Sequence, residues 1–274
     1  MTVPPDPALD LEDVVIGLGL IAGPANVVMQ LARPGVGHGV VESKVDSGNV
    51  FLHPVKRART TLTYLAVATL GTPEEKEHFR RGVNRAHAQV HSDASSPVEY
   101  NAFDTDLQLW VAACLYKGVE DIYTALGRGL TEAETEFLYR ESAVLGTTLQ
   151  VKSEMWPSDR AAFEKYWNAS LDKVSMDDVV RGYLHRLITL KFMPQVVSVP
   201  FGPLNKFVTT GFLPQRFRDE MRLPWTGKHQ RRFDRLMALN AAFVRALPPM
   251  LRKFPYNLAL WDLRRRVKNG KPLV

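Results

Sequence analysis

The chain has 274 residues, of which 45% are hydrophobic and 23% are charged, so it can bury a large core. Its 35 Lys and Arg residues exceed the 29 Asp and Glu residues only slightly, and the net charge of +6 does not by itself indicate nucleic-acid binding. Cys114 is the only cysteine, which excludes an internal disulfide and a cysteine-based zinc site. We therefore expect a reducing, cytoplasmic location, and because no stretch resembles a linker we predict one domain over residues 1–274.

The chain begins with an acidic, proline-rich arm, residues 1–12, which lacks the basic start and apolar run of an export signal. Residues 14–32 follow without any charge, over a length that would just span a bilayer. Pro24, Asn26 and three glycines make this stretch a poor spanning helix. We predict no transmembrane segment here, but a buried helix with a break near Gly23 and Pro24.

Residues 32–54 are expected to form a loop, because glycines, Ser47 and Asn49 recur through them. The glycines of GVGHG follow no clear strand, and the phosphate-loop pattern GxxxxGK[ST] is absent. We therefore predict no nucleotide site in this loop.

Helix signals dominate from residue 54 onward. Thr72, followed by Pro73 and two glutamates, is a typical helix start, and Thr131 with Glu134 matches a capping box. Further helix boundaries are expected at five positions, with starts at Ser158 and Ser175 and ends at Gly71, Gly127 and Gly129. Only residues 194–202 form a short β-branched run, and prolines bound it. The pattern predicts about ten helices with short connections, an all-α fold.

Two histidines, His87 and His91, stand four residues apart in the helix expected after Pro73. The buried stripe of this helix is defined by apolar residues at helical spacing, namely Phe79, Val83, Ala86 and Val90. His87 falls on the stripe, and His91 continues the same face one turn later. An inward histidine needs a partner, which is a hydrogen-bond acceptor in an ordinary core and a metal or a haem iron in a functional site.

Two metal sites are disfavoured by the residues around this pair. A zinc protease requires the pattern HExxH, and Ala88 occupies the position of its glutamate. A di-iron bundle requires two ExxH pairs with two further glutamates, and the chain supplies only Glu75 with His78.

The preceding helix, expected from residue 54 to Gly71, carries Arg57 and Thr61 on one face, one turn apart. Arg57 is either an end residue in a salt bridge or a cation that meets a propionate or an activated oxygen in a pocket. Thr61 either bonds the carbonyl group one turn back or donates a hydrogen bond within that pocket. The residues alone leave both alternatives open.

Five segments of the chain form a recognisable set: an arginine–threonine helix, a histidine helix, a glycine–proline start, a segment with Tyr, Asp, Leu and Trp, and a late LPW element. These motifs are RARTTLTYLAVATLG (57–71), VNRAHAQVHS (83–92), IAGPANVVMQLARPGVGHGVVE (21–42), YNAFDTDLQLWVAACL (100–115) and LPWT (223–226). Together they resemble the MpaB-type oxygenase family, which is related to latex clearing protein, the bacterial rubber oxygenase. The resemblance runs through most of the chain.

The resemblance implies a mostly helical, globin-like core that holds haem b. It places the proximal histidine at His87, and it places the arginine and threonine of the distal side at Arg57 and Thr61, where charge and a hydrogen bond stabilise bound oxygen. The rubber enzyme has a candidate base in its helix-to-loop region. Glu42 is the nearest match here, although its spacing to Arg57 differs.

Two positions depart from the family pattern. In latex clearing protein a lysine before the distal threonine can occupy the sixth iron site. Thr60 stands there in this chain, so lysine binding to the iron is not expected. The family usually has an arginine one turn after the proximal histidine. His91 replaces it here, as a candidate contact to a haem propionate.

The function that follows from the resemblance is a haem-b-dependent oxygenase that activates O2 for oxidative attack on an apolar, unsaturated substrate of isoprenoid or lipid-like chemistry. The alternatives are a haem or apolar-ligand binding protein without turnover, and a helical scaffold in which His87 is a core residue. The expected partners are O2 and an apolar small molecule, without nucleic acid. The sequence does not predict the oligomeric state.

The chain ends in a basic stretch, residues 262–274. We expect a solvated basic tail there, and a weak contact with an anionic membrane surface is the alternative.

Overall fold

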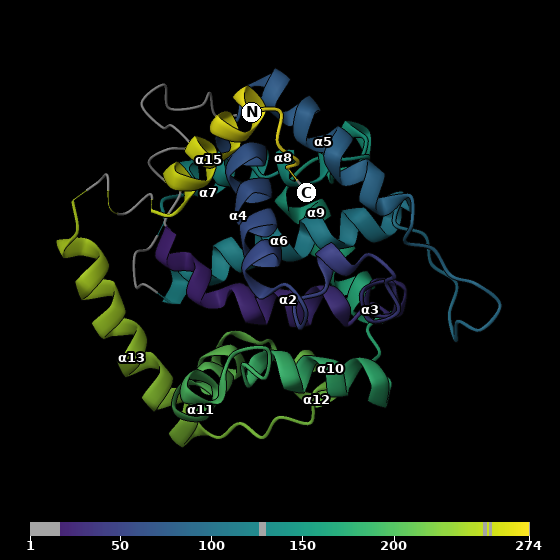
Figure 1. Cartoon of the computed structure of the whole chain (residues 1–274). Coiled ribbons are helices and arrows are strands. Elements are labelled where there is room, and N and C mark those ends of the chain that lie inside the picture. The colour runs from purple at the N-terminus through teal and green to yellow at the C-terminus, as the bar shows by residue number, and fades with distance from the viewer. Residues whose placement is uncertain (1–16, 126–129, 249–250, 252–253, 274) are drawn as a thin grey trace.

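The computed structural model is an assembly of α-helices joined by short connections, so the all-α prediction is confirmed (Figure 1). It describes residues 17–125, 130–248, 251 and 254–273. Within these ranges β structure is confined to one isolated antiparallel bridge, between His91 and Asn101. The helices in chain order are η1 (Gly17–Ala22), α2 (Gly23–Leu31), α3 (Pro34–Val41), η2 (Asp46–Gly48), α4 (Pro54–Leu70), α5 (Pro73–His87), α6 (Thr105–Ala125), α7 (Glu132–Glu141), α8 (Val144–Thr147), η3 (Ser153–Met155), α9 (Arg160–Leu171), α10 (Asp178–Ile188), α11 (Gln195–Phe212), α12 (Gln215–Glu220), α13 (Gly227–Ala246) and α15 (Tyr256–Lys268), the η elements being 3-10 helices.

The helix α6 forms the centre of the core. Its residues Trp110 and Tyr116 are buried and pack into an aromatic cluster with side chains of α9. The rings of Trp110 and Trp167 stack with centroids 5.2 Å apart, and Tyr116 meets Phe163 edge-on at 4.8 Å. Stacked and edge-on contacts are the favourable geometries of aromatic pairs, so this cluster fixes α9 against α6.

The α2 part of the uncharged segment near the N-terminus packs into the core, as predicted. The 3-10 helix η1 ends at Ala22, and α2 begins at Gly23 with Pro24 in its first turn, where the break is predicted. Asn26 of α2 donates from Nδ2 to the carbonyl oxygen of Cys114 in α6 at 2.5 Å, which ties the two helices together. Residues 14–16 of the predicted stretch lie outside the described residues. Among the described helices, none combines the length and apolar character needed to cross a membrane.

The C-terminal helix α15 packs on α4. Ala259 and Leu263 of α15 are buried in one cluster with Ala66 and Val67 of α4. Residues 262–273 are therefore not the solvated tail that the sequence suggested, because they begin inside α15 and end with Leu273, which is also buried. The basic side chains of this stretch still face solvent in part, which explains why charge alone suggested a tail.

Several predicted helix boundaries are confirmed, and others shift by one or two residues. Thr72 and Thr131 each form a complete capping box, and Gly71 caps the C-terminal end of α4. The starts predicted at Ser158 and Ser175 occur at Asp159 and Asp177, whose carboxylates accept from the backbone of the first turn. Aspartate is as good an N-cap as serine, so the nearer carboxylate takes the position. Gly127 and Gly129 lie outside the described residues.

Two segments predicted to be non-helical are helical. Residues 34–41 form α3 inside the predicted loop, with Pro34 in its first turn. The strand-like run 194–202 belongs to α11, which contains Pro200 and Pro203 in its interior. Both prolines are exposed, so water can bond the carbonyl groups that each proline leaves without a helical partner.

The helix α5 ends at His87, so the predicted continuation to Val90 and His91 is wrong. Beyond His87 the backbone tightens, because the N–H groups of Gln89 and Val90 donate to the carbonyl oxygens of Ala86 and His87 at 3.1 and 2.9 Å. His91 then pairs with Asn101 in the isolated bridge and is exposed.

The close approach of α3 to its neighbours predicts the effect of one substitution. A Cβ atom at Gly37 would lie 2.6 Å from the carbonyl oxygen of Leu31 and 3.0 Å from the Val180 side chain. We expect Gly37→Ala to lower the free energy of unfolding by about 1–3 kcal/mol through overpacking, measured by urea unfolding. Gly182→Ala is the matched control, because a Cβ atom at Gly182 in α10 meets nothing within 4 Å. It should raise the free energy of unfolding by about 0.5–1 kcal/mol, and equal losses in both variants would contradict the prediction.

Candidate functional site

His87 is the last residue of α5 and has a half-buried side chain. Its Nδ1 atom is shielded from solvent and has no hydrogen-bond partner. The ring of Phe103 lies edge-on to the imidazole, with centroids 6.2 Å apart. Burial, and then the nearby positive charge of Arg57, lower the pKa of His87 to about 4. The imidazole is therefore neutral at neutral pH, which is the form that binds metals.

Arg57 lies in α4, close enough to His87 for its charge to act on the imidazole. Burial by the surrounding protein lowers the pKa of the Arg57 guanidinium, and the charge interaction with Tyr183 of α10 opposes this shift. Its side chain is nevertheless exposed to water. Among the described residues it forms no ion pair, which removes the salt-bridge alternative for this arginine within that part of the chain.

Thr61 follows Arg57 on the same side of α4 and is also accessible. Its hydroxyl donates to the carbonyl oxygen of Arg57 at 3.1 Å, which is the local helix interaction considered from sequence. Thr60 makes the same bond to Lys56 at 3.0 Å. The Thr61 oxygen keeps its lone pairs for a ligand, but its proton is already used.

His91 does not join this site. It is exposed, and its Nδ1 lies 3.2 Å from the carbonyl oxygen of Ser92, its own neighbour. Because α5 ends at His87, the two histidines do not share a helix face, and the predicted pair is not brought together.

Glu42 belongs to a separate network at the C-terminal end of α3. Its Oε1 lies 2.6 Å from Nδ1 of His38, and its Oε2 accepts from Ser96 at 2.7 Å and from Tyr100 at 2.9 Å. Burial alone would raise the pKa of Glu42, but the hydrogen bonds from Ser96, His38 and Tyr100 outweigh it and leave the pKa lowered. Glu42 is therefore an ionised carboxylate with both oxygens occupied.

His38 extends this network to α10. It is buried, and its Nε2 lies 2.9 Å from Oδ2 of Asp177, the residue that caps α10. Sequence analysis treated the GVGHG run only as a loop and missed this histidine. The spacing of His38 and Glu42, four residues apart, could have indicated their contact, but nothing local indicates Asp177.

Tyr183, which influences Arg57, belongs to an aromatic group that was not predicted from the sequence. The ring of Phe51 lies 5.1 Å from that of Tyr183, edge-on, and the guanidinium of Arg186 lies 4.2 Å above Phe51. These residues come from two distant segments of the chain, so no sequence pattern joins them.

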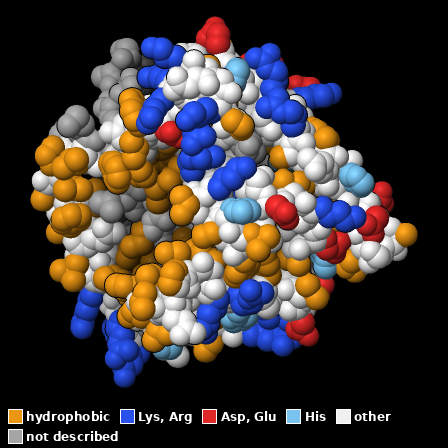
Figure 2. Space-filling model, in the orientation of Figure 1, with side chains coloured by type: hydrophobic (Ala, Val, Ile, Leu, Met, Phe, Trp, Pro, Cys, Tyr) orange, Lys and Arg blue, Asp and Glu red, His pale blue; other side chains and the backbone are white. Residues whose placement is uncertain are grey.

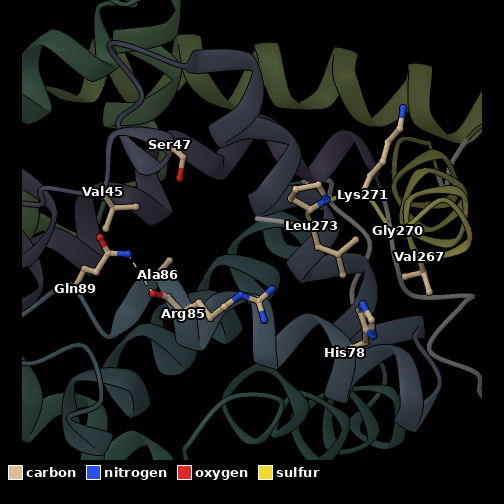
Figure 3. Close-up of a pocket in the computed structure, with 12 residues that line it drawn as sticks. Val45, Ser47, His78, Arg85, Ala86, Gln89, Val267, Gly270, Lys271 and Leu273 are labelled. Atoms are coloured by element: carbon tan, nitrogen blue, oxygen red, sulfur yellow. Dashed lines mark hydrogen bonds between the residues drawn. The ribbon is translucent and has the colours of Figure 1, made fainter.

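A groove of about 580 Å³ lies between α5 and the C-terminal segment (Figure 3). The Arg85 side chain extends along it toward His78 and Leu273. None of the predicted site residues lines this groove, so it is distinct from the surroundings of His87.

Comparison with known proteins supplies the family. The chain matches, over residues 14–242, the family model described as "ER-bound oxygenase mpaB/B'/Rubber oxygenase, catalytic domain". The chain belongs to this family. The matched range contains His87, Arg57, Thr61 and Glu42, and it ends before α15.

Two relatives are 50% identical to the chain over 250 residues, which cover 91% of this chain and 98% of each relative. They are an uncharacterized protein of Mycobacterium bovis and an uncharacterized protein of Mycobacterium tuberculosis. No solved structure matches the chain, so the globin-like arrangement expected for the family stays a prediction.

The lowered pKa of His87 predicts a pH dependence of stability. In the unfolded chain His87 takes a proton near pH 6.5, whereas the folded protein resists protonation down to about pH 4. The free energy of unfolding should therefore fall as the pH drops from 6.5 toward 4, by up to about 3 kcal/mol from this residue. Urea unfolding of the cofactor-free protein across this range would measure the slope.

The matched variants for this slope are His87→Phe and His91→Gln. The first removes the buried imidazole and should flatten the slope, while the second changes an exposed residue and should leave it as it is. An unchanged slope in His87→Phe would contradict the assignment.

Proposed function

We propose that this protein is a haem-b-dependent oxygenase that uses O2 to attack an apolar, unsaturated compound of isoprenoid or lipid-like chemistry. Membership of an oxygenase family supports the proposal. The observation that carries it is the buried, unpaired Nδ1 atom of a neutral imidazole, set beside an arginine that has no counter-ion among the described residues.

The residues around His87 fit haem b. A b-type haem needs a neutral imidazole as axial ligand, a cation to meet a propionate, and apolar side chains against the porphyrin. His87 would supply the ligand, Arg57 the cation, and the Phe103 ring an apolar contact next to the imidazole. When bound, the haem supplies the reaction with dioxygen, and the protein supplies ligand, polarity and access.

The protein's own groups have separate tasks in this proposal. The charge of Arg57 opposes protonation of His87, so the imidazole keeps a lone pair for coordination even in mildly acidic solution. The single charge of Arg57 would stabilise either a propionate or the negative charge that develops on the oxidant or the substrate. The Thr61 hydroxyl donates its proton to the backbone carbonyl oxygen of Arg57. Its oxygen can therefore only accept a hydrogen bond from a ligand, such as a water molecule or a protonated oxygen.

Glu42 is less suited to the role of a base than the sequence suggested. Its lowered pKa makes it a weak base, and three hydrogen-bond partners already hold its two oxygens. We infer that Glu42 acts as a positioning residue, because Ser96 and Tyr100 bind it from the segment that connects His87 to Phe103.

The visible spectrum tests the ligand assignment. The protein purified after expression with a haem supply should show a Soret band, and His87→Ala should lose it because no other described histidine replaces the imidazole at this position. His91→Ala is the matched control and should keep the band, since His91 is exposed. A normal band in His87→Ala, or no band in the wild-type protein, would overturn the proposal.

Oxygen uptake separates an oxygenase from a haem carrier. With unsaturated lipids or polyprenoids the wild-type protein should consume O2, and Arg57→Met should reduce the rate about a hundredfold by removing a charge that stabilises the reaction. Lys56→Met, one residue away on another side of α4, should keep the rate. A haem-loaded protein that consumes no O2 with any of these substrates would favour the carrier function.

A further inference from the structure

The first half of α11 turns its apolar side chains outward. Val196, Val199, Phe201 and Leu204 are 82%, 66%, 56% and 51% exposed. A helix on the surface of a soluble protein normally buries such residues and exposes its polar ones. An exposed apolar patch of this kind marks an interaction site.

The inward side of the same segment is small or polar. Ser198 and Gly202 are buried, and a Cβ atom at Gly202 would lie 2.6 Å from the carbonyl oxygen of Thr189. Asn205 donates from Nδ2 to the carbonyl oxygen of Ile188 at 2.8 Å. The helix is therefore held against the end of α10 by close backbone approach and hydrogen bonding, and its outward apolar side is not needed for folding.

The second half of α13 also exposes apolar side chains. The helix α13 packs against α11, and its residues Leu239 and Phe243 are 71% and 58% exposed. Figure 2 shows hydrophobic side chains gathered down the left side of this view, over the positions that α13 and the adjoining α11 occupy in Figure 1. We call the set Val196, Val199, Phe201, Leu204, Leu239 and Phe243 the apolar face.

Positively charged residues flank the α11 part of the apolar face in the sequence. Residues 192–205 carry no charge and are flanked by Lys191 and Lys206. No ion pair engages either lysine within the part of the chain that the structure describes. Between Asp178 and Asp219 the sequence contains Lys and Arg residues but no acidic residue at all.

This charge pattern selects the occupant. A symmetric contact with a second copy of the chain would bring the same lysines together around a shared apolar centre, which is repulsive. A layer of anionic lipid provides both an apolar interior for the exposed side chains and negative head groups for the lysines.

We propose that the apolar face docks on anionic membrane surfaces, with Val199, Phe201 and Leu204 at the boundary of the acyl chains and Lys191 and Lys206 among the head groups. No helix has to cross the bilayer for this mode of binding. The proposal does not depend on the oxygenase function, because lipid binding can be measured without haem or substrate.

Flotation of the full chain with vesicles tests it. The protein should float with vesicles of phosphatidylcholine and phosphatidylglycerol and much less with phosphatidylcholine alone. Val199→Glu with Phe201→Glu should lower binding to the anionic vesicles about tenfold or more. Lys191→Glu with Lys206→Glu should lower it about fivefold per lysine, and should not lower binding to the neutral vesicles.

The control is Val179→Glu, at a residue 59% exposed in the first turn of α10, beside Asp177 and Asp178, which should bind as the wild type does. Thermal unfolding should be unchanged in all these variants because the altered side chains are on the surface. If Val199→Glu with Phe201→Glu unfolds early, Leu239→Glu with Phe243→Glu takes its place.

Three outcomes would overturn the proposal. They are no binding of the wild-type protein to anionic vesicles, unchanged binding by both apolar double variants, and a wild-type dimer in sedimentation that these variants convert to a monomer. The last result would assign the apolar face to a second copy of the chain.

Discussion

The candidate site depends on a histidine that is kept neutral by burial and, to a lesser degree, by the positive charge of a nearby arginine. Arg57 and His87 lie close together, and the positive charge of the arginine disfavours a second one on the histidine. Among the described residues, Arg57 has no counter-ion, and the buried Nδ1 atom of His87 has no hydrogen-bond partner. A buried imidazole nitrogen without a hydrogen-bond partner carries a desolvation cost, which a ligand on that nitrogen would relieve, and an anionic group would neutralise the arginine.

The rest of the molecule holds these two residues in place from outside. The helix α4 carries Arg57, and it is fixed by α15 through buried Leu263 and by α8 through the hydroxyl of Tyr64, which donates to the carbonyl oxygen of Leu145. The segment after His87 is fixed by the carboxylate of Glu42, which His38 links to α10. The C-terminal helix thus belongs to the support of the site, although the family match ends before it.

Sequence analysis predicted what depends on local chemistry. Capping boxes at Thr72 and Thr131 involve residues three apart, and the break at Pro24 follows from a single ring, so these features were visible in the sequence. The end of α5 was not, because apolar spacing continues to Val90 after the helix has stopped. The helix α11 was not visible in the sequence either, because its prolines and β-branched valines are typical of a strand. Only the close packing of Gly202 on the end of α10 shows why a helix forms there. The contacts of His38 with Asp177 and of Arg57 with Tyr183 join distant segments, and no local pattern encodes them.

The position of His87 at the last residue of α5 would influence a haem bound there as proposed. The free carbonyl groups at the C-terminal end of a helix carry partial negative charge. A histidine at this end, such as His87, would therefore donate more electron density to a bound metal than a histidine in the middle of a helix. Arg57 withdraws density from the same ring. The reduction potential of a metal on this histidine would therefore be set by two opposed fields. One field is fixed by the backbone and the other comes from a single side chain, so if the proposed haem binds His87, one substitution at position 57 would shift its potential without a change of the ligand.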